Sequence, residues 1–166
     1  MKKIIAMILS LSMLLVACGS DEPAAETTYD VNEVLTAITD VTEIANETVV
    51  DDMYMDFIGL TEDIVKSYAG VFCSVTPGVD IALVVEAQDG KLEDVKAAMQ
   101  ENLDYIYSSN ENYPGPLRDK AEAGKIVSEG NIVILVIAGD VAVVESEGVE
   151  AAYAPIDTAI EEFFKK

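Results

Sequence analysis

Cys18 is the residue whose type and position most clearly indicate a specific chemistry. Its thiol is flanked by the small residues Ala17 and Gly19 and follows an apolar run over residues 4–16. Two lysines precede the run, so residues 1–17 have the positive start, apolar centre and small-residue end of a secretory signal peptide. The run is shorter than the about 20 residues that a membrane-spanning helix needs. The sequence therefore predicts that residues 1–17 are removed during export.

The segment Leu15-Val16-Ala17-Cys18 looks like a lipobox, the bacterial lipoprotein signal in which a diacylglyceryl group is attached to the cysteine sulfur before cleavage just upstream. Each buried methylene contributes roughly 0.8 kcal/mol, and two acyl chains hold a protein stably where one does not. We expect lipidation of Cys18 and anchoring at the extracytoplasmic face of the cell membrane. The alternative is an ordinary secretory signal with a chance cysteine.

The charge balance limits the partners of the exported chain. Removal of Lys2 and Lys3 leaves 8 basic residues against 31 acidic ones, a formal net charge of −23. Binding to nucleic acid depends largely on lysine and arginine, so nucleic acid is excluded as a partner. Adhesion of the domain to anionic lipid headgroups is disfavoured for the same reason. The membrane contact is expected to be made through the lipid on Cys18.

Histidine is absent from the sequence, which removes the commonest general base and the commonest neutral metal ligand. A Ser-His-Asp or Cys-His site therefore cannot form. The sequence also lacks the glycine-rich nucleotide loops, the G-x-S-x-G motif and the paired cysteines of zinc sites. A hydrolase based on two carboxylates stays formally open. We expect no enzyme activity, no catalytic residue, no cofactor and no metal site.

Calcium binding is the main chemical alternative, because clustered oxygen ligands suit this ion. Asp51, Asp52 and Asp56 lie close together in the sequence, but they match no calcium-binding loop pattern. A solvated acidic surface is the favoured interpretation.

A second cluster could mark a binding surface. Tyr105, Tyr107 and Tyr113 lie near Pro114-Gly115-Pro116 and the only arginine, Arg118. Exposed tyrosine and arginine are favoured at interfaces. The alternative is that the tyrosines pack beside the core and that Arg118 pairs with a carboxylate.

Cys73 is the only other cysteine, so acylation of Cys18 leaves no partner for an intrachain disulfide. It lies in an apolar run, and no histidine or positive residue is near it in sequence to activate the thiol. We interpret Cys73 as a small buried strand residue rather than a reactive one.

Residues 18–28 are small and acidic and are expected to form a flexible tether. Residues 29–166 are long enough for one domain with a core. Apolar spacing predicts a helix over 31–46 with Asp30 as its N-cap, whereas residues 47–60 stay ambiguous between helical and extended structure. Thr61 is expected to cap a short helix that ends before Gly70.

The second half of the domain is expected to alternate hairpins and helices. Strands are predicted at 71–76 and 79–87 around Pro77-Gly78, a long helix at 91–109, strands at 125–129 and 131–138, and a last helix with Pro155 in its first turn. This order, α-α-β-β-α-β-β-α, favours an α+β fold with a mainly antiparallel sheet of about four strands and three longer amphipathic helices.

Two of the predicted strands, within 81–85 and 132–138, are apolar throughout, as in strands buried on both faces. Either the helices divide between the two faces of the sheet, which we favour, or a partner molecule covers one face.

The segments "YDVNEVLTAI", "DFIGLTEDIVKSYAG", "VDIALVVEAQDGKLEDVKAAMQENL" and "NYPGPLRDKAEAGKIVSEGNIVILVIAGD" together resemble a family of bacterial surface lipoproteins catalogued as domain of unknown function 4358. The resemblance covers about residues 29–145 and rests on the order of elements more than on an invariant motif. Asp80 matches an acidic position of the family, whereas Ile132 stands where an aromatic residue is common. Membership implies a lipid-anchored extracytoplasmic domain of Gram-positive type, and it implies no activity.

We therefore expect a non-catalytic interaction or accessory module of the cell envelope, with a protein of the envelope as its partner. The alternative is a lipoprotein that binds a small ligand or a cation such as calcium. The oligomeric state stays open.

Overall fold

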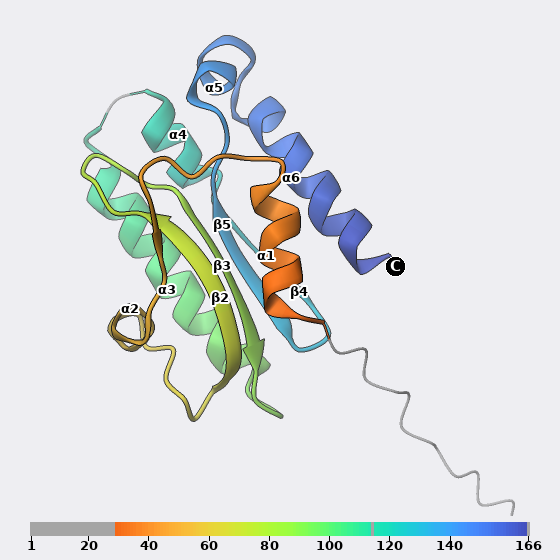
Figure 1. Ribbon diagram of the computed structural model, residues 1–166. Coiled ribbons are helices and arrows are strands. Elements are labelled where there is room, and N and C mark those ends of the chain that lie inside the picture. The colour runs from red at the N-terminus through yellow and green to blue at the C-terminus, as the bar shows by residue number, and fades with distance from the viewer. Residues whose placement is uncertain (1–28, 114, 166) are drawn as a thin grey trace, which may run out of the picture.

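The computed structural model describes residues 29–113 and 115–165, which form one antiparallel sheet with helices on both faces (Figure 1). The strand order in the sheet is β1-β2-β3-β5-β4. The strands are β1 (Glu47–Val49), β2 (Val65–Cys73), β3 (Ile81–Ala87), β4 (Lys125–Glu129) and β5 (Ile132–Ile137). The helices are α1 (Val31–Thr39), α2 (Asp52–Phe57), α3 (Leu92–Asn110), α4 (Pro116–Glu122), α5 (Val141–Glu147) and α6 (Val149–Phe164).

The strands β3 and β5 form the centre of the sheet, and every one of their residues is buried. They pair antiparallel with Leu83 opposite Leu135. Alternate side chains of a strand point to opposite faces, so a strand that is apolar at every position needs cover on both sides. The sequence pattern of these two strands therefore demands a layer of helices on each face.

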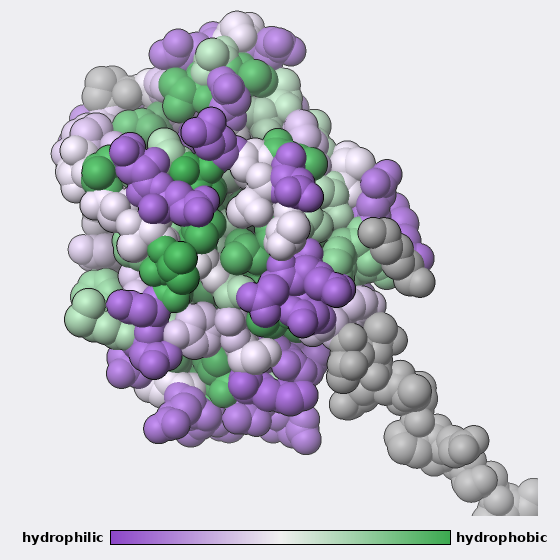
Figure 2. Space-filling model, in the orientation of Figure 1, coloured by the Kyte–Doolittle hydropathy of each residue, from purple (hydrophilic) through white to green (hydrophobic). Residues whose placement is uncertain are grey.

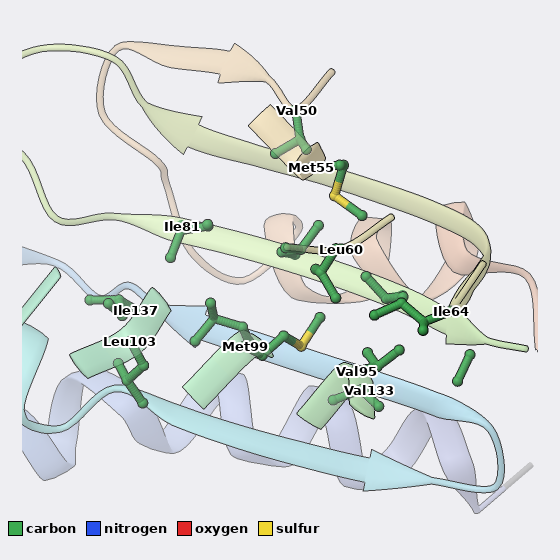
Figure 3. Close-up of a cluster of buried hydrophobic side chains, with 14 of the residues drawn as sticks. Val50, Met55, Leu60, Ile64, Ile81, Val95, Met99, Leu103, Val133 and Ile137 are labelled. Carbon is green, nitrogen blue, oxygen red and sulfur yellow. The ribbon is translucent and has the colours of Figure 1, made fainter. Parts of the chain in front are cut away.

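One face of the sheet is covered by α3 and α2. Leu83, Val133 and Leu135 of the sheet pack with Val95 and Met99 of α3. Figure 3 shows this cluster, in which side chains from the α2 region lie over one half of the sheet and those of α3 over the other. The labelled members are Val50, Met55, Leu60, Ile64, Ile81, Val95, Met99, Leu103, Val133 and Ile137.

The other face is covered by α1 and α6, which lie beside each other in Figure 1. Val34 and Ile38 of α1 and Ile156 of α6 pack on Val84 and Ile134 of the two central strands. Both faces are thus covered by helices of the same chain, and this is the arrangement favoured from the apolar strands. No partner is needed to cover the sheet.

The α+β class, the antiparallel sheet and the two hairpins are confirmed. The sheet has a fifth strand, β1, within the segment that was ambiguous, and α2 follows it. The helices α4 and α5 were not predicted. The helix expected over 31–46 ends at Thr39, although Ile44 is buried in the core from the loop that follows.

The short helix expected between Thr61 and Gly70 is wrong, because this segment is largely the strand β2. Gly70 is not a helix terminator but lies in mid-strand, where a Cβ atom would come within 2.9 Å of Leu83 Cδ1 and 3.0 Å of Ala82 O. Glycine is needed there because neighbouring chain segments approach closely. Pairing with β3 outweighs the local capping signal of Thr61.

The position of Pro155 was also wrong. α6 begins at Val149, after Gly148 with its positive φ of 92°, so the proline lies inside the helix rather than in its first turn. Its side chain is exposed, on the side of α6 away from the sheet. Proline has no backbone N–H, so the carbonyl of Ala151, four residues earlier, receives no helical hydrogen bond from position 155.

In the part of the chain that the structure describes, no helix is both long enough and apolar enough to cross a bilayer. The predicted signal peptide, Cys18 and the tether over 18–28 lie outside the described residues.

Candidate functional site

Two large apolar side chains of α2 are exposed, Met53 at 77 % and Phe57 at 72 %. They are four residues apart and so share one face of the helix. The other side of α2 is held by the core, where Met55 is buried and Tyr54 stacks on Phe72 of β2 with 4.7 Å between ring centroids. Burial of that side of α2 turns Met53 and Phe57 outward.

Tyr105 of α3 completes this surface. α3 turns Met99 and Leu103 to the sheet, and Tyr105 lies on its outer side with 58 % of its surface exposed. Its ring meets that of Phe57 edge to face, with 6.3 Å between centroids. We call Met53, Phe57 and Tyr105 the α2–α3 patch. A hollow of about 350 Å³ lies between the two helices, lined by Asp56, Phe57, Ile58, Gly59, Glu101, Asn102 and Tyr105.

The composition of the patch suits binding of another protein. Phenylalanine, tyrosine and methionine are enriched at protein interfaces, whereas exposed apolar residues of other surfaces are usually scattered singly. Asp56 and Glu101 add carboxylates to the hollow beside the rings. Figure 2 shows apolar side chains interspersed with hydrophilic ones on the face it presents, with no broad apolar surface over the sheet. The patch is therefore a local feature and not an uncovered core.

The tyrosines singled out in the sequence do not form one site. Tyr105 belongs to the patch, whereas Tyr107 is half-buried and packs against the core. Tyr113 is exposed in the loop after α3, and Arg118 is exposed on α4. Among the described residues, no ring contact or hydrogen bond joins Tyr107, Tyr113 or Arg118 to the patch. Met53 and Phe57 were not predicted from the sequence as site residues. Their spacing of four positions within an acidic segment was a signal, because it puts both side chains on one face of a helix.

The three aspartates considered for calcium have separate roles. Asp51 caps α2 by accepting a hydrogen bond from the Tyr54 N–H at 2.9 Å. Asp52 accepts one from the Tyr68 hydroxyl at 2.6 Å; this bond, together with burial and the nearby negative charges, raises the pKa of Tyr68 to about 12. Asp56 is exposed and lines the hollow of the patch. Across residues 29–113 and 115–165, no three histidine, cysteine, aspartate or glutamate side chains are grouped so that they could hold a metal ion.

Cys73 is the last residue of β2 and is half-buried. Its Sγ lies 3.7 Å from the carbonyl oxygen of Val75. The predicted strand location is confirmed, but the thiol is less buried than we expected.

A buried ion pair joins α4 to the sheet and was not predicted from the sequence. Lys120 is 1 % exposed, and its Nζ contacts the carboxylate of Asp80, which directly precedes β3 and is 7 % exposed. The Tyr153 hydroxyl of α6 donates to the Lys120 carbonyl at 3.0 Å and accepts from the Ala138 N–H at 3.4 Å. Burial raises the pKa of Tyr153. Both charges are buried, so a ligand cannot reach them. The network instead joins α4 and α6 to the start of β3.

Glu86 lies near the other end of β3 from Asp80 and joins neighbouring segments there. Its carboxylate accepts hydrogen bonds from Lys66 at 2.7 Å, Ser67 at 2.8 Å and Asn131 at 2.9 Å. Burial by itself raises the pKa of Glu86, but these three bonds together outweigh it and lower the pKa below the ordinary value of 4.5. Glu86 thus stays ionised and ties β2 and the β4–β5 turn to the central strand.

The lowered pKa predicts a pH-dependent role for Glu86. A carboxylate whose pKa is lower in the folded state stabilises the fold above the unfolded pKa, and this contribution is lost as the pH falls through the folded pKa. Glu86→Gln should lower the free energy of unfolding by about 2 kcal/mol at neutral pH, since hydrogen bonds to a charged group are lost. Urea unfolding of both proteins should show this difference shrinking below a pH of about 4.5, the ordinary value for glutamate. A difference that stays constant down to the acid-unfolding limit would contradict the assignment.

Fold and site together define a class of protein: a single α+β domain whose antiparallel sheet is covered by helices on both faces and which exposes Met53, Phe57 and Tyr105 together on one helix pair. The model of the family described as "Domain of unknown function (DUF4358)" matches residues 39–138. The chain belongs to this family, as the resemblance of its segments implied. No curated protein and no solved structure matches the chain.

Proposed function

We propose that this protein is a lipid-anchored, non-catalytic interaction module of the bacterial cell envelope, and that it binds a partner protein through the α2–α3 patch. The observation that carries the proposal is the joint exposure of Met53, Phe57 and Tyr105 on a domain whose sheet needs no further cover. Such aromatic residues supply much of the energy of protein interfaces. The absence of histidine from the sequence supports a binding role over a catalytic one.

The anchoring part of the proposal rests on the lipobox-like segment that ends at Cys18. A lipid at that position would hold the domain at the extracytoplasmic surface of the membrane, where envelope proteins are its neighbours. The acidic surface would keep the domain itself away from anionic headgroups. A calcium-binding function is not favoured by any arrangement of the described residues.

In-cell photo-cross-linking tests the patch. With a photoreactive phenylalanine analogue in place of Phe57, we expect a reproducible adduct with one envelope protein. Tyr105→Ser in the same chain should reduce the adduct roughly thirtyfold, because a central aromatic contact of an interface contributes about 2 kcal/mol and about 1.4 kcal/mol corresponds to a factor of ten.

The matched control places the same analogue at Glu145, an exposed position of α5 that lies outside the patch. This position should give no such adduct. Equal adducts from positions 57 and 145, or an adduct that Tyr105→Ser leaves unchanged, would rule out the patch as the binding surface.

A further inference from the structure

The outer edge of β2 is only partly covered by β1. The short strand β1 pairs with residues 71–73 of β2, and the Val50 N–H extends this pairing by donating to the Gly70 carbonyl at 2.9 Å. Before Gly70, none of the described strands lies on that side of β2. A sheet edge of this kind can pair with an extended segment of another chain.

The backbone of Tyr68 presents the groups for such pairing. Backbone N–H and C=O groups alternate between the two sides of a strand, so residues two apart point the same way. Because the Gly70 carbonyl points outward to Val50, the N–H and C=O of Tyr68 point outward as well. Ala69 and Val71 alternate with Tyr68 and Gly70 along the strand, so their N–H and C=O groups point to the other side, toward β3. Both residues are paired with β3. The edge at Tyr68 therefore offers one donor and one acceptor.

A groove of about 550 Å³ runs along this edge. Its walls are residues 65–68 of β2 on one side and α2 with the following loop on the other. Met55 and Leu60, both buried, supply apolar surface, and Asp52, Asp56 and Glu62 supply carboxylates. The groove is thus open to an extended chain and negatively charged.

The charges of the groove select its occupant. Lys66 also lines it, but its Nζ forms a salt bridge with Glu86 at 2.7 Å, so the three carboxylates dominate. They are not grouped to hold a metal ion. A second copy of the exported chain, with 8 basic residues against 31 acidic ones and so a formal net charge of −23, would be repelled. A segment that alternates lysine or arginine with apolar residues matches both the carboxylates and the apolar floor.

We propose that the edge of β2 at Tyr68 binds an extended, basic segment of the partner protein as an added antiparallel or parallel strand. This inference rests on the proposed function, and it specifies the chemistry of the partner beside the α2–α3 patch. The segment exchanges backbone hydrogen bonds with the N–H and C=O of Tyr68. Its positive side chains lie against Asp52, Asp56 and Glu62.

Synthetic peptides test the proposal on the full chain in uncharged detergent micelles. The probe is a peptide of about eight residues, enough for one strand, in which lysine alternates with valine. Two matched peptides replace lysine by glutamate, or carry N-methyl groups on alternate residues and so lose the donors of one edge. We expect binding of the first peptide only, with slowed hydrogen exchange of the Tyr68 amide.

Charge variants of the protein test whether the lysine peptide binds because of the carboxylates of the groove or because of the overall negative charge of the chain. Asp52→Asn, Asp56→Asn and Glu62→Gln together should weaken binding of the lysine peptide about tenfold, as expected from the loss of three surface ion pairs. The control combines Glu145→Gln, Glu147→Gln and Glu150→Gln, which make the same change in net charge at exposed positions away from the groove. This control should bind as the parent does.

Equal binding of the N-methylated peptide, an unprotected Tyr68 amide, or equal weakening by both sets of charge variants would overturn the inference. Failure of the strand-edge inference can be distinguished from failure of the proposed function. If the adduct from position 57 depends on Tyr105 while the peptides do not bind, the patch stands and the strand-edge inference is wrong. If the adduct is absent as well, the proposed function fails with it.

Discussion

Replacing Lys120 with alanine is expected to lower the free energy of unfolding by about 3–5 kcal/mol, because the change leaves the carboxylate of Asp80 buried without its counter-charge. Lys120 and Asp80 have side chains only 1 % and 8 % exposed. Solvent therefore cannot replace the missing partner. Chemical denaturation followed by circular dichroism measures the effect.

The size of this effect reflects the cost of an unpaired buried charge and not the net contribution of the pair. Taking both charges out of water costs free energy that their attraction only partly returns. Lys120→Met combined with Asp80→Leu should therefore recover most of the stability that either single change loses. Recovery by the double variant would show that the single changes destabilise the fold through an unpaired buried charge and not through a loss of packing volume.

An exposed salt bridge supplies the control. Lys96 bonds Glu93 on α3 at 3.0 Å, with side chains 37 % and 80 % exposed. Lys96→Ala should change the free energy of unfolding by less than about 1 kcal/mol. A loss below about 1 kcal/mol for Lys120→Ala as well would show that Asp80 is compensated in another way.

Loss of the lipid is the second large effect expected, and it should follow from replacing Cys18 alone. Cys18→Ala removes the sulfur to which the proposed diacylglyceryl group is attached, and with it two acyl chains whose buried methylenes contribute roughly 0.8 kcal/mol each. Cells supplied with labelled fatty acid should incorporate label into the parent protein and not into this variant. The variant should also leave the lipid fraction, either secreted or with residues 1–17 retained.

The second cysteine of the chain is the matched control. Cys73→Ala removes a thiol at the end of β2 and should leave labelling and fractionation unchanged. Undiminished label on Cys18→Ala, or its loss from Cys73→Ala, would contradict the assignment of Cys18 as the attachment point.

Long, regular patterns in the sequence predicted the larger elements well. The helix expected over 91–109 is α3, Leu92–Asn110, and the strands expected over 125–129 and 131–138 are β4 and β5. The apolar run within 132–138 also predicted cover on both faces. These elements are set by periodic burial along one segment, which a sequence displays directly.

Features that depend on distant segments were not predicted. The first part of β2 was interpreted as a helix that ends before Gly70, because its pairing with β3 and the close approach of Ala82 to Gly70 are tertiary. Phe57 points outward because Met55 and Tyr54 pack against the core and Phe72, and these contacts are made with residues distant in the sequence. Lys120 and Asp80 are 40 positions apart in the numbering, and nothing local marks either as buried. Of the candidate site, the sequence alone indicated Tyr105.

The pairing of α1 with α6 has a consequence for how the domain folds. Tyr29 contacts the rings of Phe163 and Phe164, with centroids 5.9 Å and 4.8 Å apart, so the first and last described elements meet on one face of the sheet. α1 leaves the ribosome long before α6, and its apolar side then has only half of its final surroundings. A chain that stops before Val149 would leave this face of the sheet covered by α1 alone, as a partly folded species that chaperones and proteases recognise. The native state is therefore reached only when α6 packs beside α1 and completes the cover of this face of the sheet.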